Sequence, residues 1–290
     1  PGPSLSKHIE HLKQAQGRAV LLAPLQSLKR LYREGIRPDF ALVLDAQDQT
    51  TGSLDFFGEI PDDWLPDLIA SNATHPQVLR RFSGANVYFF NAASPLDAML
   101  VNAMRSPWPS LNAGSVAISC FRLAQHWRCS PIVLVGQDLA FSEGHRYADD
   151  RVGSVPKLIR ELPGYHGGTV STTPDYFLFH HQFEVLAAGY RAQDPALRLF
   201  NCTEGGASIG GFEQKPLSEV LQSHVLGLPP LPPLTAPGDA AGRAQRREEI
   251  RVRIQATRDR AKEGLRQVER CERSAGQAHQ GTSSLNRLAK

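Results

Sequence analysis

Short apolar runs recur along this chain, and segments of helix length separate them. Five of these runs have the length of buried strands: Ala19–Ala23, Phe40–Leu44, Asn86–Phe90, Pro131–Val135 and Leu197–Phe200. Parallel strands need long crossover connections, usually helices, so this alternation favours parallel pairing. The sequence therefore predicts an α/β fold of the Rossmann-like, doubly wound kind, with a mostly parallel sheet and helices on both faces.

Helical periodicity marks several of the intervening segments. Leu5, Ile9 and Leu12 are spaced as on one face of a first helix. A second helix around Leu28 ends at Gly35, where glycine suits a left-handed cap. Two longer helices are predicted at about 114–127 and 174–188, whereas residues 46–85 are expected to be loop-rich with short helical pieces.

The charge distribution divides the chain into unequal parts. The formal net charge is +3, yet residues 241–290 hold thirteen Lys/Arg and six Asp/Glu, which leaves nineteen and twenty-three for residues 1–240. We expect a Rossmann-like domain over 1–227, a Pro-rich linker over 228–240 and a basic helical extension over 241–290. A solvated charged helix is favoured over nucleic-acid binding. Its few apolar residues are spaced to form a narrow stripe against a partner, a second copy of the chain or a missing domain: Ile250, Ile254, Ala261, Leu265 and Val268.

The sequence also favours a soluble, cytoplasmic protein. No apolar stretch approaches the roughly 18 to 20 residues that a membrane helix needs. The first residues, Pro1-Gly2-Pro3-Ser4-Leu5, lack the basic stretch and apolar core of a signal peptide. Four cysteines without C-x-x-C spacing are expected to be reduced thiols rather than metal ligands.

Polar residues follow four of the five predicted strands. Asp45, Asn91, Gly136-Gln137-Asp138 and Asn201-Cys202-Thr203 stand at these strand ends. In open parallel sheets, ligands bind in the crevice outside the carboxyl ends of the strands. Each residue alone is compatible with a turn or a helix cap, but together they predict a ligand site at this edge.

Two helix entries carry glycine and serine. Gly2-Pro3-Ser4 precedes the first helix, and Gly114-Ser115 precedes the long middle helix. Free backbone N–H groups at a helix start favour an anion, although a serine N-cap explains Ser4 equally well. The pair suggests a ligand with a phosphate or carboxylate at both ends.

Several titratable residues are candidates for chemistry. Asp45 and Asp48, with Asp138, are one set that could hold Mg²⁺ beside a diphosphate; the alternative is that each is a cap or a ribose contact. His145 and His166 lie in predicted loops and are candidate general bases. His180 and His181 fall within a predicted helix and are expected to be structural.

Three common catalytic signatures are not formed by the sequence. No G-x-G-x-x-G follows a strand, and no P-loop occurs. The string G-x-S-x-G at Gly206–Gly210 does not directly follow a predicted strand, as a nucleophile elbow does. Dinucleotide-dependent hydride transfer, P-loop phosphoryl transfer and α/β-hydrolase chemistry are therefore disfavoured.

Five motifs occur in the order seen in the motility-associated factor (Maf) flagellin glycosyltransferases, and over about 1–222 the chain resembles that family. The motifs are Gly2-Pro3-Ser4-Leu5, Gly35-Ile36-Arg37-Pro38-Asp39 leading to Leu44-Asp45, Gly114-Ser115-Val116-Ala117, Val135–Phe141 and Asn201–Ala207. The family's central domain is similar to bacterial sialyltransferases and to 6-hydroxymethylpterin diphosphokinase-like proteins.

The resemblance implies a cytoplasmic enzyme that transfers a pseudaminic, legionaminic or sialic-type nonulosonic acid from its CMP-activated form to Ser/Thr of flagellin. No cofactor is firmly implied. His166, His145 and Asp138 are the expected catalytic residues. The expected donor-binding residues are Gly2, Pro3, Ser4, Asp45, Asn91, Gly114, Ser115, Gly136, Gln137, Tyr147, Asn201 and Thr203. The alternatives are a Mg-dependent diphosphokinase-like enzyme, with Asp45 and Asp48 as metal ligands, and a non-catalytic module that binds flagellin or a nucleotide sugar.

Overall fold

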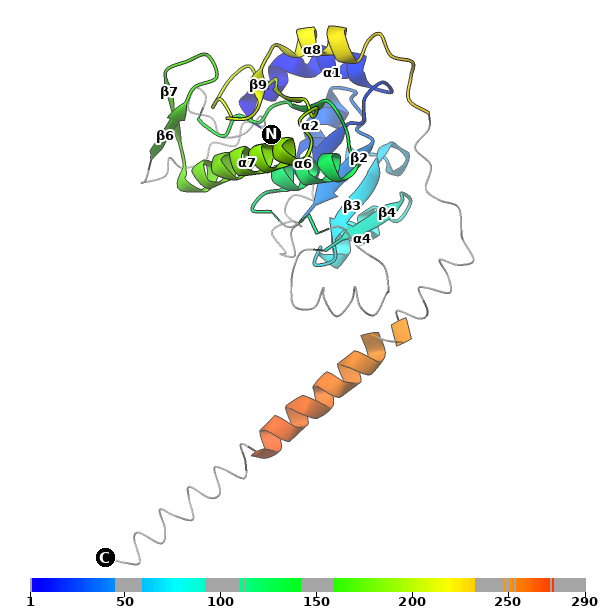
Figure 1. Cartoon of the computed structure of the whole chain (residues 1–290). Helices are drawn as coiled ribbons and strands as arrows, with labels where there is room; N and C mark the ends of the chain where they lie inside the picture. The colour runs from blue at the N-terminus through cyan, green and yellow to red at the C-terminus, as the bar shows by residue number, and fades with distance from the viewer. Residues whose placement is uncertain are drawn as a thin grey trace, which may run out of the picture. The chain divides into compact units, whose positions relative to one another are not determined.

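The structure is a computed structural model that describes residues 2–44, 59–91, 110–111, 113–141, 159–232, 248, 251–252, 254–271 and 273. The chain divides into two compact units, one of Pro1–Ala98 with Pro107–Leu234 and one of Met99–Ser106 with Thr235–Lys290. The first unit contains all the labelled strands and helices (Figure 1).

Four parallel strands form one sheet of the first unit. They are β1 (Leu22–Pro24), β2 (Phe40–Val43), β3 (Asp67–Ser71) and β4 (Val87–Phe90), in the order β1-β2-β3-β4. In β2 every side chain is buried, which explains its continuous apolar sequence. Phe40 pairs with Leu22 on one side and with Asp67 on the other.

A second parallel sheet contains β5 (Ile132–Leu134), β8 (Leu199–Asn201) and β9 (Glu213–Gln214), in the order β5-β8-β9. Ile132 pairs with Leu199, and Phe200 pairs with Glu213. An antiparallel hairpin, β6 (Arg160–Pro163) and β7 (Thr169–Thr172), stands apart from both sheets in the strand pairing.

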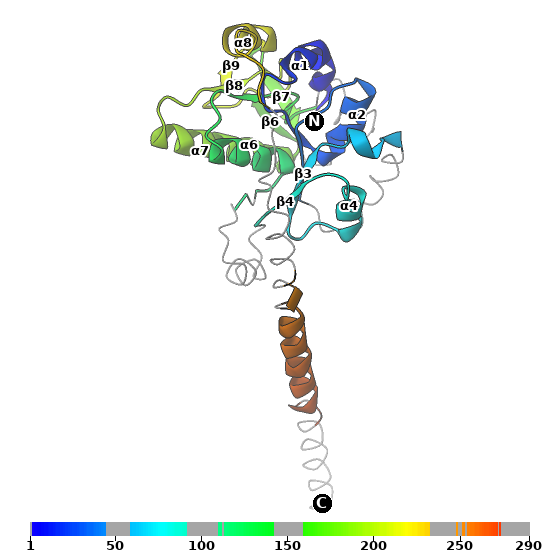
Figure 2. The same cartoon turned by 90° about the vertical axis from the view of Figure 1, so that its right-hand side faces the viewer.

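Helices cover the sheets and connect their strands. The 3-10 helix η1 (Pro3–His8) leads into α1 (Ile9–Ala15), and η2 (Leu25–Ser27) leads into α2 (Leu28–Arg33). The remaining labelled helices are η4 (Asp62–Trp64), α4 (Pro76–Arg81), α6 (Val116–His126), α7 (Pro174–Gln193) and α8 (Leu217–His224). Figures 1 and 2 show α6 alongside α7, and α1 beside α8.

Helix α6 joins the cores of the two sheets. Its Ile118 and Phe121 are buried in a cluster with Ile132 and Leu199, whereas Leu123 packs in a second cluster with Phe40. Phe121 also meets the aromatic rings of α7 and of the loop before β9. A single amphipathic helix therefore holds the two sheets side by side within the first unit.

The α/β, Rossmann-like fold class expected from the sequence is confirmed. All five predicted strands are present, with β1 displaced toward the end of its run, at Leu22–Pro24. The expectation for residues 46–85 was wrong at one point, because β3 lies within it and contributes a buried strand to the first sheet. The hairpin, β9 and α8 were not predicted.

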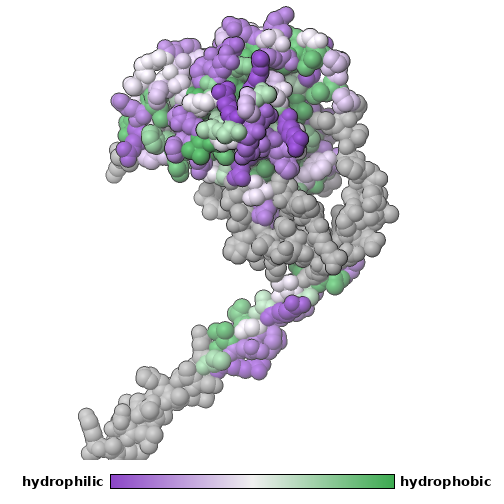
Figure 3. Space-filling model, viewed as in Figure 1, coloured by the Kyte–Doolittle hydropathy of each residue, from purple (hydrophilic) through white to green (hydrophobic). Residues whose placement is uncertain are grey.

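The described residues of the second unit, 248, 251–252, 254–271 and 273, are all helical. Ile254, Leu265 and Val268 are at least half exposed on it, and Figure 3 shows apolar and polar surface along the helix. This helix agrees with the expected C-terminal helical extension. The boundaries at 227 and 240 stay predictions. None of the described helices combines the length and the apolar character needed to cross a membrane.

Candidate functional site

The Gly-Pro-Ser loop (Gly2–Leu5) lies beside the carboxyl end of β5. Gly2 is extended, with φ −77° and ψ 176°, and its backbone N–H donates to the carbonyl oxygen of Gly136 at 2.7 Å. From Pro3 onward the loop forms the first turn of η1, with Gly2 at the N-cap position. The first predicted anion-binding loop and the Gly136-Gln137-Asp138 strand end are therefore adjacent, although about 130 residues separate them in the sequence.

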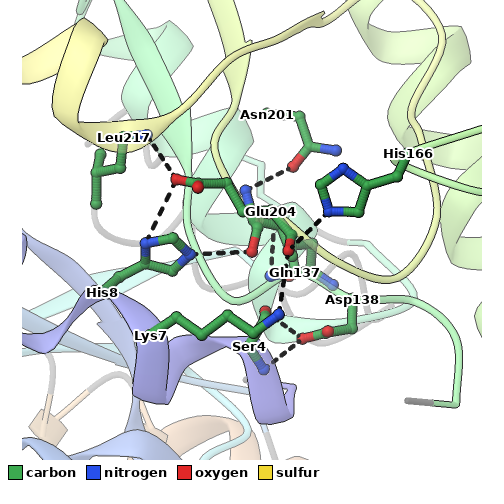
Figure 4. Close-up of polar contacts among 10 residues, drawn as sticks. Ser4, Lys7, His8, Gln137, Asp138, His166, Asn201, Glu204 and Leu217 are labelled. Atoms are coloured by element: carbon green, nitrogen blue, oxygen red, sulfur yellow. Dashed lines mark hydrogen bonds and ion pairs between the residues drawn. The ribbon is translucent and has the colours of Figure 1, made fainter.

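Asp138 anchors this loop. Its side chain is buried, and its Oδ2 accepts a hydrogen bond from Ser4 Oγ at 2.7 Å and a longer one from Ser4 N at 3.4 Å (Figure 4). Gly2 packs so closely that a Cβ there would lie 1.8 Å from Asp138 Oδ2. The carboxylate predicted as catalytic is thus placed beneath the loop, where it positions Ser4.

Gly206 closes on Asp138 from the other side. It has φ +64°, and a Cβ on it would lie 2.2 Å from the carbonyl oxygen of Asp138. That oxygen accepts from Ala207 N at 2.8 Å. A Cβ at this position would clash with backbone atoms, which cannot shift aside as the end of a flexible side chain can. Glycine is therefore required here.

The carboxyl ends of β5 and β8 are joined by a buried polar chain. Gln137 N donates to Thr203 Oγ1 at 3.1 Å, and Thr203 N donates to Asn201 Oδ1 at 3.2 Å. Asn201 Nδ2 in turn donates to Gln214 Oε1 of β9 at 2.6 Å. Asn201 and Thr203 are fully buried, so their polar atoms are used to connect strand ends.

Glu204 lies at the centre of a second set of contacts, shown in Figure 4. Its Oε1 accepts from Leu217 N, at the start of α8, at 2.8 Å and lies 3.7 Å from Nδ1 of the buried His8. His8 Nε2 lies 3.0 Å from the carbonyl oxygen of Thr203. Glu204 itself has φ +54°, unusual for a residue with a side chain. The contacts of His8 and Leu217 hold it in this conformation.

The exposed side chains of Lys7 and His166 both contact the backbone carbonyl oxygen of Glu204. Lys7 Nζ donates to its carbonyl oxygen at 3.3 Å, and His166 Nε2 lies 3.4 Å from the same oxygen (Figure 4). Gly205 follows, and a Cβ there would lie 3.5 Å from Ser4 Cβ and 3.8 Å from Lys7 Nζ. His166, one of the two predicted bases, is therefore in the same neighbourhood as the Gly-Pro-Ser loop.

The turn of the β6–β7 hairpin carries His166. Gly164 N donates to Gly168 O, and Tyr165 N donates to Gly206 O at 2.9 Å, so the hairpin is tied to the loop that encloses Asp138. The Tyr165 ring stacks edge-on against His166. Burial, followed by the charges of Cys202, Glu204 and Glu219, raises the pKa of Tyr165 to about 12. Tyr165 therefore stays protonated at neutral pH.

A cavity of about 690 Å³ lies beside Gly2, the start of α6 and the carboxyl end of β5, and its described lining does not include Lys7, His166 or Glu204. Its lining includes both predicted Gly/Ser entries, Gly2 and Gly114–Ser115, together with the strand end Gly136–Asp138. From there it extends between β1 and β5. The volume is in the range typical of small-molecule sites. The predicted ligand-binding edge therefore coincides with a real hollow in the molecule.

The second Gly/Ser entry is built for close packing. Ser115 caps α6, accepting from Ile118 N at 3.3 Å. A Cβ on Gly114 would lie 2.9 Å from the Phe179 ring of α7, so glycine lets α7 approach. Asn91, predicted at another strand end, forms a parallel bridge with Ser110 and does not line the cavity.

Several predicted site residues lie outside the described residues: Asp45, Asp48, His145 and Tyr147. Their assignments stay predictions. Over the described ranges, no three His, Cys, Asp or Glu side chains gather in a way that could hold a metal ion. His180, expected to be structural, is buried in α7 with Nε2 2.7 Å from Ser208 O.

Sequence reasoning missed Lys7, His8 and Glu204. Lys7 carried one usable signal, because a basic residue three positions after a Gly-Pro-Ser helix entry is placed to meet the same anion. His8 and Glu204 gave none, since their contact joins positions 8 and 204 and depends on the complete fold.

Comparison with known proteins adds two findings. Residues 1–144 match the family model described as 6-hydroxymethylpterin diphosphokinase MptE-like. Among solved structures, a Maf glycosyltransferase from Magnetospirillum magneticum AMB-1 is similar with a TM-score of 0.59 and 20% sequence identity. The similarity covers 87% of this chain and 36% of that one, so the chain spans about a third of its length. No curated protein matches the sequence significantly.

The resemblance expected from the sequence is confirmed in two ways: residues 1–144 match the MptE-like family model, and the fold is similar to part of a Maf glycosyltransferase.

Proposed function

We propose that this chain is a glycosyltransferase domain that moves a nonulosonic acid from a CMP-activated donor to Ser/Thr hydroxyls of flagellin. The observation that carries the proposal is the cavity, whose lining unites Gly2, Gly114–Ser115 and Gly136–Asp138. The fold shared with a Maf glycosyltransferase supports the same reaction class.

The donor is a double anion, with a phosphodiester and a sugar carboxylate. Backbone N–H groups at the start of α6 are suited to such groups because they point outward at a helix entry. In the Gly-Pro-Ser loop, the N–H groups of Gly2, Ser4 and Leu5 already donate within the protein. Lys7 adds a positive charge next to the loop, where it bonds to the Glu204 carbonyl. Half-buried Gln137 offers an amide to the base or ribose.

In the proposed reaction, the acceptor hydroxyl oxygen bonds to the anomeric carbon while the bond from that carbon to the CMP oxygen breaks. The hydroxyl proton passes to His166, which is exposed and lies beside the loop, and CMP departs with the bonding electrons. Backbone N–H groups and Lys7 stabilise the charge on the leaving phosphate. Asp138 serves this step by holding Ser4 and the loop.

One observation favours a second candidate, a Mg-dependent diphosphokinase-like enzyme. The matched family model, over residues 1–144, bears that activity in its description. Asp45 and Asp48, which follow β2, would then be the metal ligands.

Calorimetry with CMP, CMP-sialic acid and ATP, each with and without Mg²⁺, separates these candidates. The transferase proposal expects CMP to bind without metal. ATP binding that requires Mg²⁺, with no binding of CMP, would replace it by the diphosphokinase. Binding of CMP-sialic acid without any transfer to flagellin by the full chain would instead indicate a binding module.

The base is tested by His166→Ala, with His181→Ala as its matched control, because His181 is an exposed histidine on α7 away from the loop. We expect transfer by the His166 variant to fall about 10²–10⁴-fold with CMP affinity preserved. If both variants kept full activity, His166 would not be the base.

A further inference from the structure

The helix over residues 254–271 carries large apolar side chains that are exposed on one side. Ile254, Leu265 and Val268 are 50%, 65% and 58% exposed. Because each residue of an α-helix turns about 100° around the axis, these three and Ala261 lie within an arc of about 60°. In the view of Figure 3, hydrophobic and hydrophilic residues lie on different sides of this helix.

Small uncharged residues widen this arc on one side. Thr257, Gly264 and Cys271 continue it, so that the described residues within about 120° of the helix surface carry no charge. A helix that packs on an apolar surface needs a stripe at least about 100° wide. The arc is therefore wide enough to be buried against another surface, and we call these seven residues the apolar face: Ile254, Thr257, Ala261, Gly264, Leu265, Val268 and Cys271.

Cations line both borders of the apolar face. Arg258 and Lys262 lie about 20° and 60° beyond Leu265 around the axis, and Arg260 lies about 20° beyond Cys271 at the other border. Arg258 and Lys262 are four residues apart, a spacing at which like charges repel on a helix. Within the part of the chain that the structure describes, none of the three cations forms an ion pair.

The described acidic residues of the helix are mostly remote from the apolar face, and two of them already have cationic partners. Glu263 lies on the far side of the helix, 3.4 Å from Arg266 and 3.9 Å from Arg270. Glu269 is nearer to the border, but it pairs with Arg273 at 3.7 Å. The positive charge beside the apolar face is therefore the part that an external anion can neutralise.

A flat anionic surface with an apolar interior fits this arrangement. Helices that lie in a membrane interface bury one apolar face at the acyl boundary, while lysine and arginine at its borders extend their charged ends to the headgroups. A second copy of the helix would bring like charges together, because both borders are cationic. A nucleic acid would neutralise the cations but would leave the apolar face in water.

We propose that this helix binds the surface of an anionic lipid bilayer, with the apolar face at the acyl boundary and Arg258, Arg260 and Lys262 at the lipid phosphates. The apolar side chains are few and mostly small, so anionic lipid supplies most of the affinity and salt weakens it. The helix lies along the surface and does not cross the bilayer. This proposal does not depend on the reaction proposed for the first unit.

Cosedimentation of the full chain with lipid vesicles tests the proposal. We expect binding to phosphatidylcholine vesicles that contain roughly one third phosphatidylserine, and little binding to phosphatidylcholine alone. The double variant Arg258→Gln, Lys262→Gln should bind about 20–30-fold more weakly, because each cation at such a surface contributes about fivefold. Its matched control is Arg266→Gln, Arg270→Gln, which removes the same charge away from the apolar face and should weaken binding less than about fivefold.

A second pair of variants tests the apolar face. Leu265 lies on it, whereas Val252 is also exposed, at 53%, but lies about 140° away around the axis. We expect Leu265→Gln to weaken vesicle binding at least about fivefold and Val252→Gln to leave it within about twofold.

Three results would overturn the proposal. The first is an absence of binding to the anionic vesicles, or equal binding to vesicles of phosphatidylcholine alone. The second is an equal loss in the two charge variants, which would show attraction to net charge without an oriented face. The third is dimerisation of the full chain in sedimentation velocity without lipid that Leu265→Gln abolishes, which would assign the apolar face to a second copy.

Discussion

Replacing Gly206 by alanine tests whether close packing around Asp138 builds the site. Gly206 has φ +64°, a conformation that costs a residue with a Cβ about 1–2 kcal/mol. The new Cβ would also lie 2.2 Å from Asp138 O and 2.6 Å from Asp138 Cα. Forcing an extra carbon against backbone typically costs a further ~1–3 kcal/mol. We therefore expect the free energy of unfolding to fall by about 2–5 kcal/mol.

Gly168→Ala is the matched control for this prediction. Gly168 has φ +67°, and a Cβ there meets nothing within 4 Å. Both changes restrict the unfolded chain equally, so the difference between the variants isolates the contact with Asp138. Urea unfolding with comparable m values measures both free energies. Equal losses, within about 0.5 kcal/mol, would refute the conclusion that Asp138 is enclosed by required glycines.

Three further predictions follow from buried polar groups. Ser4→Ala removes the hydrogen bond to Asp138 Oδ2 and is expected to lower the free energy of unfolding by about 1.5–3 kcal/mol, with no comparable loss for the exposed Ser6→Ala. Burial raises the pKa of the Cys202 thiol to about 12, so in the folded protein it should react with a thiol reagent at pH 8 far more slowly than the exposed Cys271; comparable rates would contradict its burial. Burial also raises the pKa of Asp39 above 3.8, so its contribution to stability is largest below pH 3.8 and is lost as pH rises through the raised value. The Asp39→Asn variant retains an acceptor for Leu21 N. As pH rises from 3.8 through the raised pKa of Asp39, the Tm of this variant should fall less than that of the parent.

The sequence was sufficient for the fold class because its predicted strands are apolar runs, two of which, β2 and β8, are buried at every residue. Phe40–Val43 is apolar at every position, and such runs are visible without knowledge of the partners. Strand β3 was not predicted because its apolar centre, Leu68–Ala70, is only three residues long and is bounded by Asp67 and Ser71. Its strand conformation depends on pairing with β2 and β4, which is tertiary information.

The candidate site was predictable where the topological rule applied and not beyond it. Gly2, Gly114–Ser115 and Gly136–Asp138 were all expected at the ligand-binding edge, and they line one cavity. The rule did not predict the contact between His166 and Glu204. That contact depends on the β6–β7 hairpin, which the hydrogen bond from Tyr165 N to Gly206 O holds in place. No pattern near position 166 specifies that contact.

The polar groups near the strand ends of this molecule have two different roles. Ser4, Asp138, Asn201 and Thr203 are buried, and their hydrogen bonds join the Gly-Pro-Ser loop, β5 and β8 to one another. Such groups keep the backbone of the loop in place without presenting their own side chains to solvent. The groups at the edge that solvent reaches are of another kind: the exposed side chains of Lys7 and His166, the half-buried Gln137 and the backbone of the helix entries.

This division predicts different consequences for the two sets. Changing a buried member, as in Ser4→Ala, should lower stability and ligand affinity together, because the loop that carries the binding groups loses its anchor. Changing an exposed member, as in Lys7→Ala, should weaken CMP binding with Tm nearly unchanged, since a single exposed hydrogen bond contributes little to folding. Parallel measurement of Tm and of CMP affinity in the two variants separates the roles. Loss of Tm in the Lys7 variant equal to that in the Ser4 variant would show that the strand-end groups act as one structural unit.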